Sequence, residues 1–127
     1  MAFPTERPRR LRQSSAVRNL VAQTRLHPAE LVLPLFVREG AETQPSASMP
    51  GVVQHSLDSL AVVAKEAVAA GLGGLMLFGV PTVRDATGSG ADDPEGILNV
   101  GLRRLRDTVG DDLVIMSDLC LDEFTDH

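Results

Sequence analysis

Three uninterrupted apolar runs constrain the fold of this chain more than any other feature. They occupy residues 31–37, 75–78 and 113–116. A strand that is apolar at every position has both faces covered, which is typical of parallel sheets flanked by helices. The sequence therefore predicts strands near residues 31–37, 74–79 and 112–117. Pro34 lies inside the first run and has no N–H to donate, so that strand is expected to be hydrogen-bonded irregularly or on one side only.

Between the runs, apolar side chains recur at helical spacing. One stretch follows Ser56, a good N-cap residue, and closes at Gly71. The second closes at Gly110, and the pair Asp93-Pro94 predicts its cap and first-turn proline. The expected order is strand, helix, strand, helix, strand, with right-handed crossovers. The apolar positions are Leu57, Leu60, Ala64, Ala67 and Val68 in the first helix and Leu98, Leu102, Leu105 and Val109 in the second.

This order predicts an α/β fold but leaves two architectures open. Three such strands form either half of a doubly wound sheet or the opening of an eight-stranded β/α barrel of about 250 residues. The turns after the first two strands lack the Gly-x-Gly-x-x-Gly fingerprint of dinucleotide-binding folds. Gly88-Ser89-Gly90 comes too late after the second run to cradle a phosphate, and a mobile surface turn is expected there.

The amino-terminal segment differs from the rest in charge. Residues 1–40 contain seven of the twelve basic residues and only three of the seventeen acidic ones. Residues 1–28 are predicted to form an arm with a short helix that begins at Ser14 or Ser15 and ends at Pro28, and residues 29–127 a partial β/α barrel. No aromatic residue interleaves the arginines of the arm, so the acidic surface of a protein partner is expected rather than nucleic acid. These arginines are Arg7, Arg9, Arg10 and Arg12.

Cysteine usage and hydropathy predict the compartment. Cys120 is the single cysteine, which excludes an internal disulfide and fits a reducing environment. No apolar run approaches the roughly 18 residues of a membrane span. The sequence thus predicts a cytoplasmic protein with no membrane partner.

The carboxyl-terminal segment carries the strongest candidates for chemistry. Ser117 and Asp118 fall at the end of the third strand, where catalytic groups of β/α barrels gather. An acid beside an apolar strand suggests a polar site, although an Asp that only caps the next turn is an equal alternative. Cys120 and Asp122 are two residues apart, so their side chains can point the same way and share a cation. The alternatives are a buried cysteine and a solvated acidic loop.

Other titratable residues are expected to be structural. Lys65 is the only lysine and lies off the apolar stripe of its helix, so it is predicted to face solvent. A Schiff-base lysine needs desolvation or a neighbouring cation, which nothing near Lys65 provides. His27 and His55 flank helix ends and are expected to be structural or exposed. Met49-Pro50-Gly51 predicts a tight turn.

Six segments occur in an order that resembles the amino-terminal part of the porphobilinogen synthase (5-aminolevulinate dehydratase) family. Any one of them is weak, but together they are collinear over nearly the whole chain. The resemblance implies an N-terminal arm plus the first three β/α units of a TIM (β/α)8 barrel, truncated. The segments are Arg7-Pro8-Arg9-Arg10-Leu11-Arg12, residues 33–37 with 39–40, 48–52, 78–79, Asp85 with Gly88, Ser89 and Ala91, and 117–127.

The family condenses two molecules of 5-aminolevulinate into porphobilinogen in heme biosynthesis, a lyase reaction that uses Schiff-base lysines. The resemblance implies that those lysines lie beyond His127, so this chain alone is expected to be inactive. It also implies that the basic arm wraps a neighbouring subunit, usually in a homo-octamer. Two other hypotheses remain: a free-standing interaction module that uses the arm and an open sheet, and another Schiff-base barrel lyase or aldolase.

The resemblance also implies roles for the carboxyl-terminal residues. Asp118, with Ser117 beside it, would orient a substrate amine and a catalytic lysine. Zinc-using members carry cysteines at the positions of Cys120 and Asp122. The carboxylate at 122 favours a harder cation, so magnesium is expected over zinc. Magnesium-dependent members usually lack Cys120, so this sequence lies between the two classes.

Overall fold

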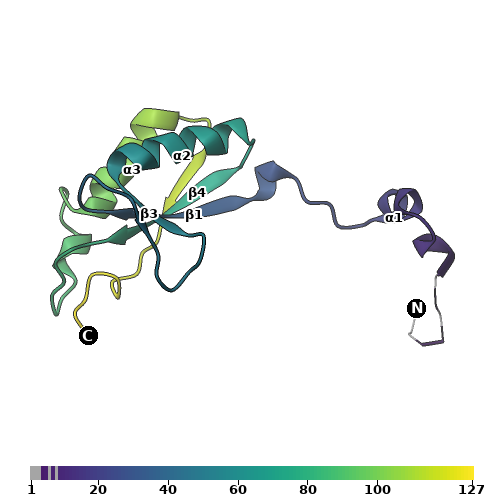
Figure 1. Cartoon of the computed structure of the whole chain (residues 1–127), viewed down its shortest axis with the longest axis horizontal. Coiled ribbons are helices and arrows are strands. Elements are labelled where there is room, and N and C mark those ends of the chain that lie inside the picture. The colour runs from purple at the N-terminus through teal and green to yellow at the C-terminus, as the bar shows by residue number, and fades with distance from the viewer. Residues whose placement is uncertain (1–3, 6, 8) are drawn as a thin grey trace.

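The computed structural model describes residues 4–5, 7 and 9–127, and within them an α/β domain carries a separate amino-terminal arm (Figure 1). Residues 1–3, 6 and 8 of the predicted arm lie outside the described residues. The 3-10 helices are Arg9–Arg12 (η1), Pro28–Glu30 (η2) and Ser89–Ala91 (η3), and the α-helices are Ser15–Val21 (α1), Leu57–Ala69 (α2) and Ile97–Val109 (α3). The strands are Val32–Arg38 (β1), Gln44–Pro45 (β2), Val53–His55 (β3), Gly74–Val80 (β4) and Val114–Ser117 (β5).

The strands form one sheet in the order β2-β3-β1-β4-β5. β1, β4 and β5 run parallel, with Val32 opposite Gly74 and Gly74 opposite Val114, which confirms the three predicted strands to within two residues at each end. β3 adds a parallel neighbour to β1, and β2 pairs antiparallel with β3. β3 reaches only Phe36 and Val37 of β1, so Pro34 has a strand neighbour, β4, on one side alone, as its missing N–H predicted.

The sequence did not predict β2 and β3. These strands have two and three residues, Gln44–Pro45 and Val53–His55, and neither contains an apolar run. A turn lies between them. In it the N–H of Val52 donates to the carbonyl of Met49 over 3.0 Å, and Gly51 has φ 86°. The predicted turn at Met49-Pro50-Gly51 is confirmed, and it reverses the chain between the two short strands.

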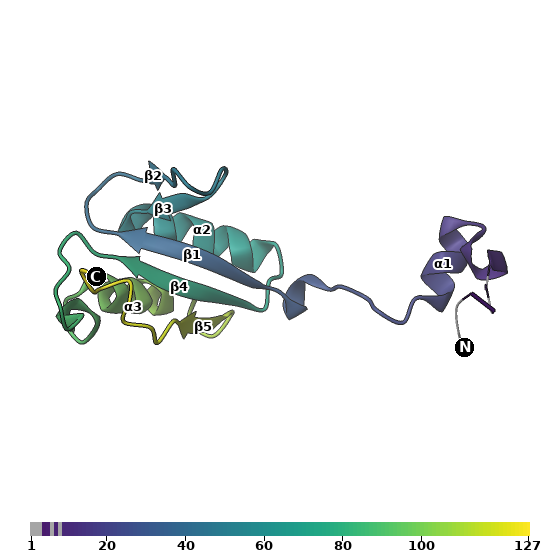
Figure 2. The same cartoon turned by 90° about the horizontal axis from the view of Figure 1, so that it is seen from below.

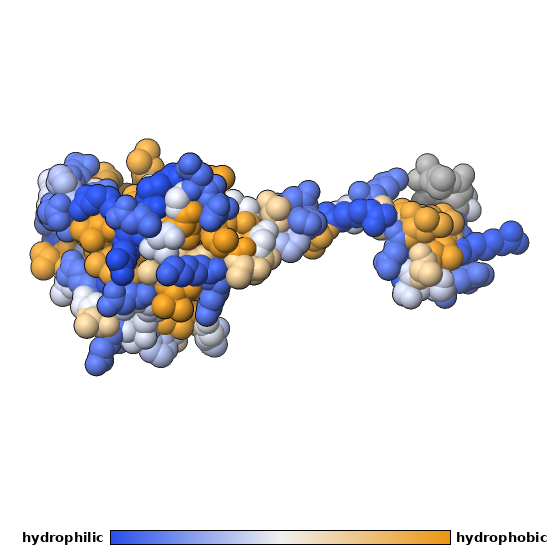
Figure 3. Space-filling view, turned by 90° about the horizontal axis from the view of Figure 1, so that it is seen from above, coloured by the Kyte–Doolittle hydropathy of each residue, from blue (hydrophilic) through white to orange (hydrophobic). Residues whose placement is uncertain are grey.

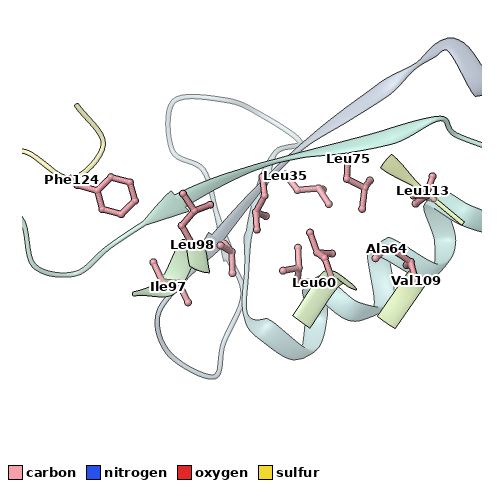
Figure 4. Close-up of a cluster of buried hydrophobic side chains, with 13 residues drawn as sticks. Leu35, Leu60, Ala64, Leu75, Ile97, Leu98, Val109, Leu113 and Phe124 are labelled. Atoms are coloured by element: carbon pink, nitrogen blue, oxygen red, sulfur yellow. The ribbon is translucent and has the colours of Figure 1, made fainter. Parts of the chain in front are cut away.

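Helices α2 and α3 pack on one face of the sheet and enclose the core (Figure 4). Leu35 and Val37 of β1 and Leu75 and Leu77 of β4 point into this layer and are at most 5% exposed. Close packing of α3 depends on Gly101, because a Cβ there would lie 3.0 Å from Cδ2 of Leu77. The remaining core residues are Leu60, Ala64, Ala67, Ile97, Leu98, Leu105, Val109, Leu113 and Phe124.

The opposite face of the sheet carries no helix among the described residues (Figure 2). The rings of Phe36 and Phe78 stack on this face with centroids 5.4 Å apart and planes at 28°. Val32 is 46% exposed and Val114 is 60% exposed. The prediction that helices cover both faces of the sheet is therefore met on one face among the described residues. On the other face, which α2 and α3 do not reach, the strands still carry apolar side chains.

The helix ends test the predicted caps. Ser56 caps α2 by accepting a hydrogen bond from the N–H of Ser59 at 3.3 Å, as predicted. Gly110 ends α3 with φ 55°, also as predicted. The predicted start of α3 is wrong, because its N-cap is Gly96 and Asp93-Pro94 form a turn before it. In that turn the carboxylate of Asp93 accepts from the N–H of Glu95 at 2.9 Å.

The arm stands away from the sheet in Figure 1, and Figure 3 shows it as a distinct group of atoms with apolar side chains on its surface. Leu20 and Leu26 are 80% and 82% exposed. Ser14 caps α1, but the helix ends at Val21 rather than at Pro28. Pro28 instead opens η2, where the imidazole of His27 accepts from the N–H of Ala29 at 3.2 Å.

No helix in the described part of the chain has the length and hydropathy needed to cross a membrane.

Candidate functional site

The segment after β5 holds the predicted site residues. Ser117 is the last residue of β5 and is exposed, and Asp118 follows it half-buried. The N–H of Asp118 points to the carbonyl of Leu77 at 3.4 Å, which extends the contact between β5 and β4. Both side chains therefore lie at the carboxyl edge of the sheet, where the sequence predicted them.

A small pocket of about 130 Å³ lies behind this segment. Ser117, Asp118 and Cys120 form one wall, and Leu98 and Asn99 of α3 form the other. Three of the four predicted site residues thus meet at one place, and Asp122 is not part of the lining.

Phe124 anchors the segment to the domain. Its ring is 1% exposed and packs against the end of β4 (Figure 4). A Cβ on Gly79 would lie 2.9 Å from Cζ of Phe124, and one on Gly90 would lie 3.3 Å from Cδ1. Two glycines thus make room for the ring, and the ring fixes the position of the acidic residues that precede it.

Asp85 ties a second loop to the same segment. Its backbone N–H donates to the carbonyl of Phe124 at 3.2 Å, and its carbonyl accepts from the N–H of Asp126 at 3.2 Å. Its carboxylate accepts two hydrogen bonds from Thr87, at 2.8 and 2.9 Å, and two from Ser89, of which the one from the Ser89 N–H is 3.1 Å. These bonds, those from Ser89 first, hold the pKa of Asp85 well below its usual range. The predicted surface turn at residues 88–90 is thus closed onto Asp85.

Cys120 and Asp122 point toward each other, as their spacing predicted. The thiol of Cys120 donates to Oδ1 of Asp122 over 2.5 Å, and both residues are exposed. This hydrogen bond is the main cause that raises the pKa of Cys120, and the charges of Asp122 and Asp118 act in the same direction. The alternative of a buried cysteine is wrong, while the alternative of a solvated acidic loop describes Asp122.

The residues present do not complete a metal site. Cys120 and Asp122 offer one sulfur and one carboxylate, whereas zinc sites use at least three protein ligands. The described residues contain no group of three His, Cys, Asp or Glu side chains placed to hold a metal ion. His127 lies near Asp126, at 3.6 Å between Nδ1 and Oδ1, and adds no third ligand to the pair.

Glu123 lines a second pocket, of about 220 Å³. Its Oε2 is buried and has no hydrogen-bond partner. Burial is the main cause that raises the pKa of Glu123, followed by the charges of Asp118 and Asp122, while the N–H of Gly79 and the charge of Arg84 oppose it. Nothing in the local sequence pattern distinguishes Glu123 from its exposed neighbours.

The remaining candidates lie outside this site. Lys65 is exposed on α2, as predicted. The imidazole of His55 lies 2.7 Å from the hydroxyl of Ser59, and burial lowers the pKa of His55. The arginines of the arm are exposed and belong to the part of the chain that stands away from the sheet (Figure 1); they are Arg7, Arg9, Arg10 and Arg12.

Comparisons with known proteins agree on one family. The family model for delta-aminolevulinic acid dehydratase matches residues 5–127. The delta-aminolevulinic acid dehydratases of Streptomyces coelicolor and Mycobacterium leprae are 60% and 61% identical over 99% and 98% of this chain. The solved structure of the Toxoplasma gondii enzyme in complex with the reaction product porphobilinogen superposes with a TM-score of 0.86 at 30% identity, over 95% of this chain.

These matches also fix what share of the relatives the chain represents. It spans 39% of the length of the Streptomyces and Mycobacterium relatives and 35% of the Toxoplasma chain. The family model covers all but the first four residues, and the matched region includes the arm, the sheet and the segment with Asp118. The chain therefore belongs to the delta-aminolevulinic acid dehydratase family, whose members it matches over their amino-terminal part.

Proposed function

We propose that this chain supplies the arm and the opening β/α units of a porphobilinogen synthase, a lyase that condenses two 5-aminolevulinate molecules in heme biosynthesis. The observation that carries the proposal is the identity of 60% over 99% of the chain with the Streptomyces coelicolor enzyme. The sheet supports it, because β1, β4 and β5 run parallel with α2 and α3 on one side, the arrangement of consecutive barrel units.

Asp118 is the residue proposed to act on substrate. It lies half-buried at the carboxyl end of β5, so its carboxylate can orient a substrate ammonium and a neighbouring lysine, with the hydroxyl of Ser117 beside it. The Schiff-base lysines would come from outside these residues. Lys65, the only lysine here, is exposed on the helical layer, so the chain alone is proposed to be inactive.

A divalent cation would lie beside Cys120 and Asp122, with further ligands from elsewhere in the protein. When bound, such an ion supplies Lewis-acid polarisation of a substrate oxygen. The carboxylate of Asp122 supports magnesium over zinc, while the thiol of Cys120 suits zinc better. Because the two side chains already share a hydrogen bond of 2.5 Å, binding at this pair must displace the thiol proton or the bond.

The arm is proposed to bind a neighbouring subunit in a homo-octamer in the cytoplasm. Its side chains support this role, because Leu20 and Leu26 are more than three-quarters exposed in the part of the chain that the structure describes. The same exposed arm and the uncovered face of the sheet favour the second candidate function, an interaction module that binds an intact enzyme of the family.

A chimera separates these functions. The 127-residue chain would replace the region of the Streptomyces coelicolor enzyme that it matches, and porphobilinogen formation would be measured. We expect activity in the chimera and its loss in the Asp118→Asn variant, with Asp126→Asn as the matched control. A soluble chimera that binds 5-aminolevulinate but forms no porphobilinogen would contradict the enzyme function and leave the interaction module.

A further inference from the structure

The loop that follows β4 has no part in the proposed function, although it lies directly against the candidate site. The N–H of Asp85 donates to the carbonyl of Phe124 at 3.2 Å, and the carbonyl of Asp85 accepts from the N–H of Asp126 at 3.2 Å. Gly88 is buried, and a Cβ on it would lie 3.4 Å from the carbonyl oxygen of Leu121. The loop therefore supports the segment after β5 through main-chain contacts at two places.

The stretch with the candidate site residues depends on supports of this kind. The N–H of Asp118 reaches the carbonyl of Leu77 only over the long distance of 3.4 Å. In the part of the chain that the structure describes, the N–H groups of Leu119 and Cys120 donate no backbone hydrogen bond. The stretch is therefore held at its two ends, by β5 before it and by the β4 loop and the ring of Phe124 after it.

One carboxylate fixes the shape of the β4 loop. Oδ1 of Asp85 accepts from the N–H and the hydroxyl of Thr87, at 2.8 and 2.9 Å, and from the N–H of Ser89 at 3.1 Å. Oδ2 accepts from the hydroxyl of Ser89. Because these donors converge on one side chain, the loop curls around it and brings Gly88, with φ 67°, against Leu121. Loss of the carboxylate would leave the donors without their acceptor and release the curl.

We propose that Asp85 is a positioning residue for the reaction: its carboxylate shapes the loop that holds the segment after β5, and so sets where Asp118 meets the substrate. This role rests on the proposed function and extends it to a residue to which that function gives no part. A reacting group misplaced by about 1 Å can lower a rate about 100-fold, so a support that acts only through the backbone is sufficient to matter.

Steady-state kinetics of the Streptomyces coelicolor chimera test this role. Asp85→Ala should lower kcat for porphobilinogen formation by up to about 100-fold with a smaller change in KM, because the displaced groups act mainly in the transition state. Asp85→Asn should keep most of the wild-type kcat, because its carbonyl oxygen can still accept the three hydrogen bonds that Oδ1 accepts. Asp107→Asn, at an exposed position of α3, is the matched control for the loss of a charge.

Amide NMR spectra of the 127-residue chain give a readout that does not require activity. Asp85→Ala should shift or broaden the amide resonances of Leu119 and Cys120, whereas Asp85→Asn should leave them near their wild-type positions. A residue that contributes only to overall stability would leave these resonances unchanged in the folded variant while the free energy of unfolding falls. The double variant Thr87→Val/Ser89→Ala removes the two hydroxyl donors and should act in the same direction, so the role remains testable if Asp85→Ala does not fold.

Three results would overturn the proposal. The first is an active wild-type chimera in which folded Asp85→Ala keeps the wild-type kcat. The second is a folded Asp85→Ala chain whose Leu119 and Cys120 resonances do not move. The third is an Asp85→Asn variant as slow as Asp85→Ala, since charge and not hydrogen bonding would then decide the rate. Failure of the proposed function is distinguished from these, because the wild-type chimera then forms no porphobilinogen, and the role of Asp85 in the reaction falls with it.

Discussion

Phe124 lies against Gly79 so closely that a Cβ at position 79 would be 2.9 Å from Cζ of the ring. This contact joins the segment that holds Asp118, Cys120 and Glu123 to the end of β4. The position of the candidate site therefore depends on the absence of a side chain at Gly79 as much as on the acids themselves.

Gly79→Ala should destabilise the chain by about 1–3 kcal/mol, the usual cost of adding a methyl group to a packed core. The added Cβ would also lie 3.1 Å from Cβ of Leu98, so it meets α3 as well as the ring. Urea denaturation followed by circular dichroism measures the effect, with Ser48→Ala in the exposed turn as control. A Gly79→Ala variant as stable as the wild type would show that Phe124 does not fix the segment.

Gly73→Ala tests the junction between the arm and the sheet. A Cβ at Gly73 would lie 2.1 Å from the carbonyl oxygen of Ala29 in η2, and this neighbour is backbone that cannot rotate away. The substitution should displace η2 and break the hydrogen bond of 3.1 Å from Gly73 N–H to the carbonyl of Leu31. We expect the free energy of unfolding to fall by about 1–3 kcal/mol, and the amide of residue 73 to exchange faster than in the wild type. Unchanged exchange there would contradict this arrangement.

Asp85 should make stability depend on pH in the acid range. Its pKa is lowered in the folded chain, so its contribution is fully present above the unfolded value of about 3.9 and is lost as pH falls through the lower folded value. Asp85→Asn removes that dependence, so the gap in unfolding free energy between wild type and variant should narrow from pH 7 to pH 3. Denaturant titrations at the two pH values measure it. A gap that widens toward low pH would contradict the assigned hydrogen bonds.

Asp122 should suppress the reactivity of Cys120. The carboxylate accepts the thiol proton and raises the pKa of Cys120, so less thiolate is present near pH 8. Asp122→Asn should increase the rate of alkylation by iodoacetamide several-fold, and Asp126→Asn should leave it near the wild-type rate. Equal rates in wild type and Asp122→Asn would indicate that the two side chains do not interact in solution.

Much of the domain could be predicted from local signals. The apolar runs predicted β1, β4 and β5, and Ser56 predicted the start of α2, because burial on a sheet and capping of a helix each depend on a few neighbouring residues. The predicted start of α3 was wrong, because Asp93-Pro94 is a sequence typical of a helix start but forms a turn here. Asp93 lies four residues before the helix begins at Ile97.

The candidate site could be predicted only in part. Asp118 and the pairing of Cys120 with Asp122 followed from their place after a strand and from their spacing. Glu123 could not be distinguished, because the residues that share its pocket, among them Met49, Gly79 and Arg84, are distant in sequence. The pattern of apolar residues also could not predict that one face of the sheet is left uncovered, because it shows only which residues are apolar and not what packs on them.

Borohydride trapping with 5-aminolevulinate tests the central claim most directly, namely that this chain holds the supporting residues of the site and takes its reactive lysines from elsewhere. The 127-residue chain and the chimera with the Streptomyces coelicolor enzyme would each be treated with substrate and reductant and analysed by mass spectrometry. We predict a covalent adduct in the chimera, on a lysine outside the grafted residues, and none on the isolated chain. An adduct on Lys65 of the isolated chain would contradict the account.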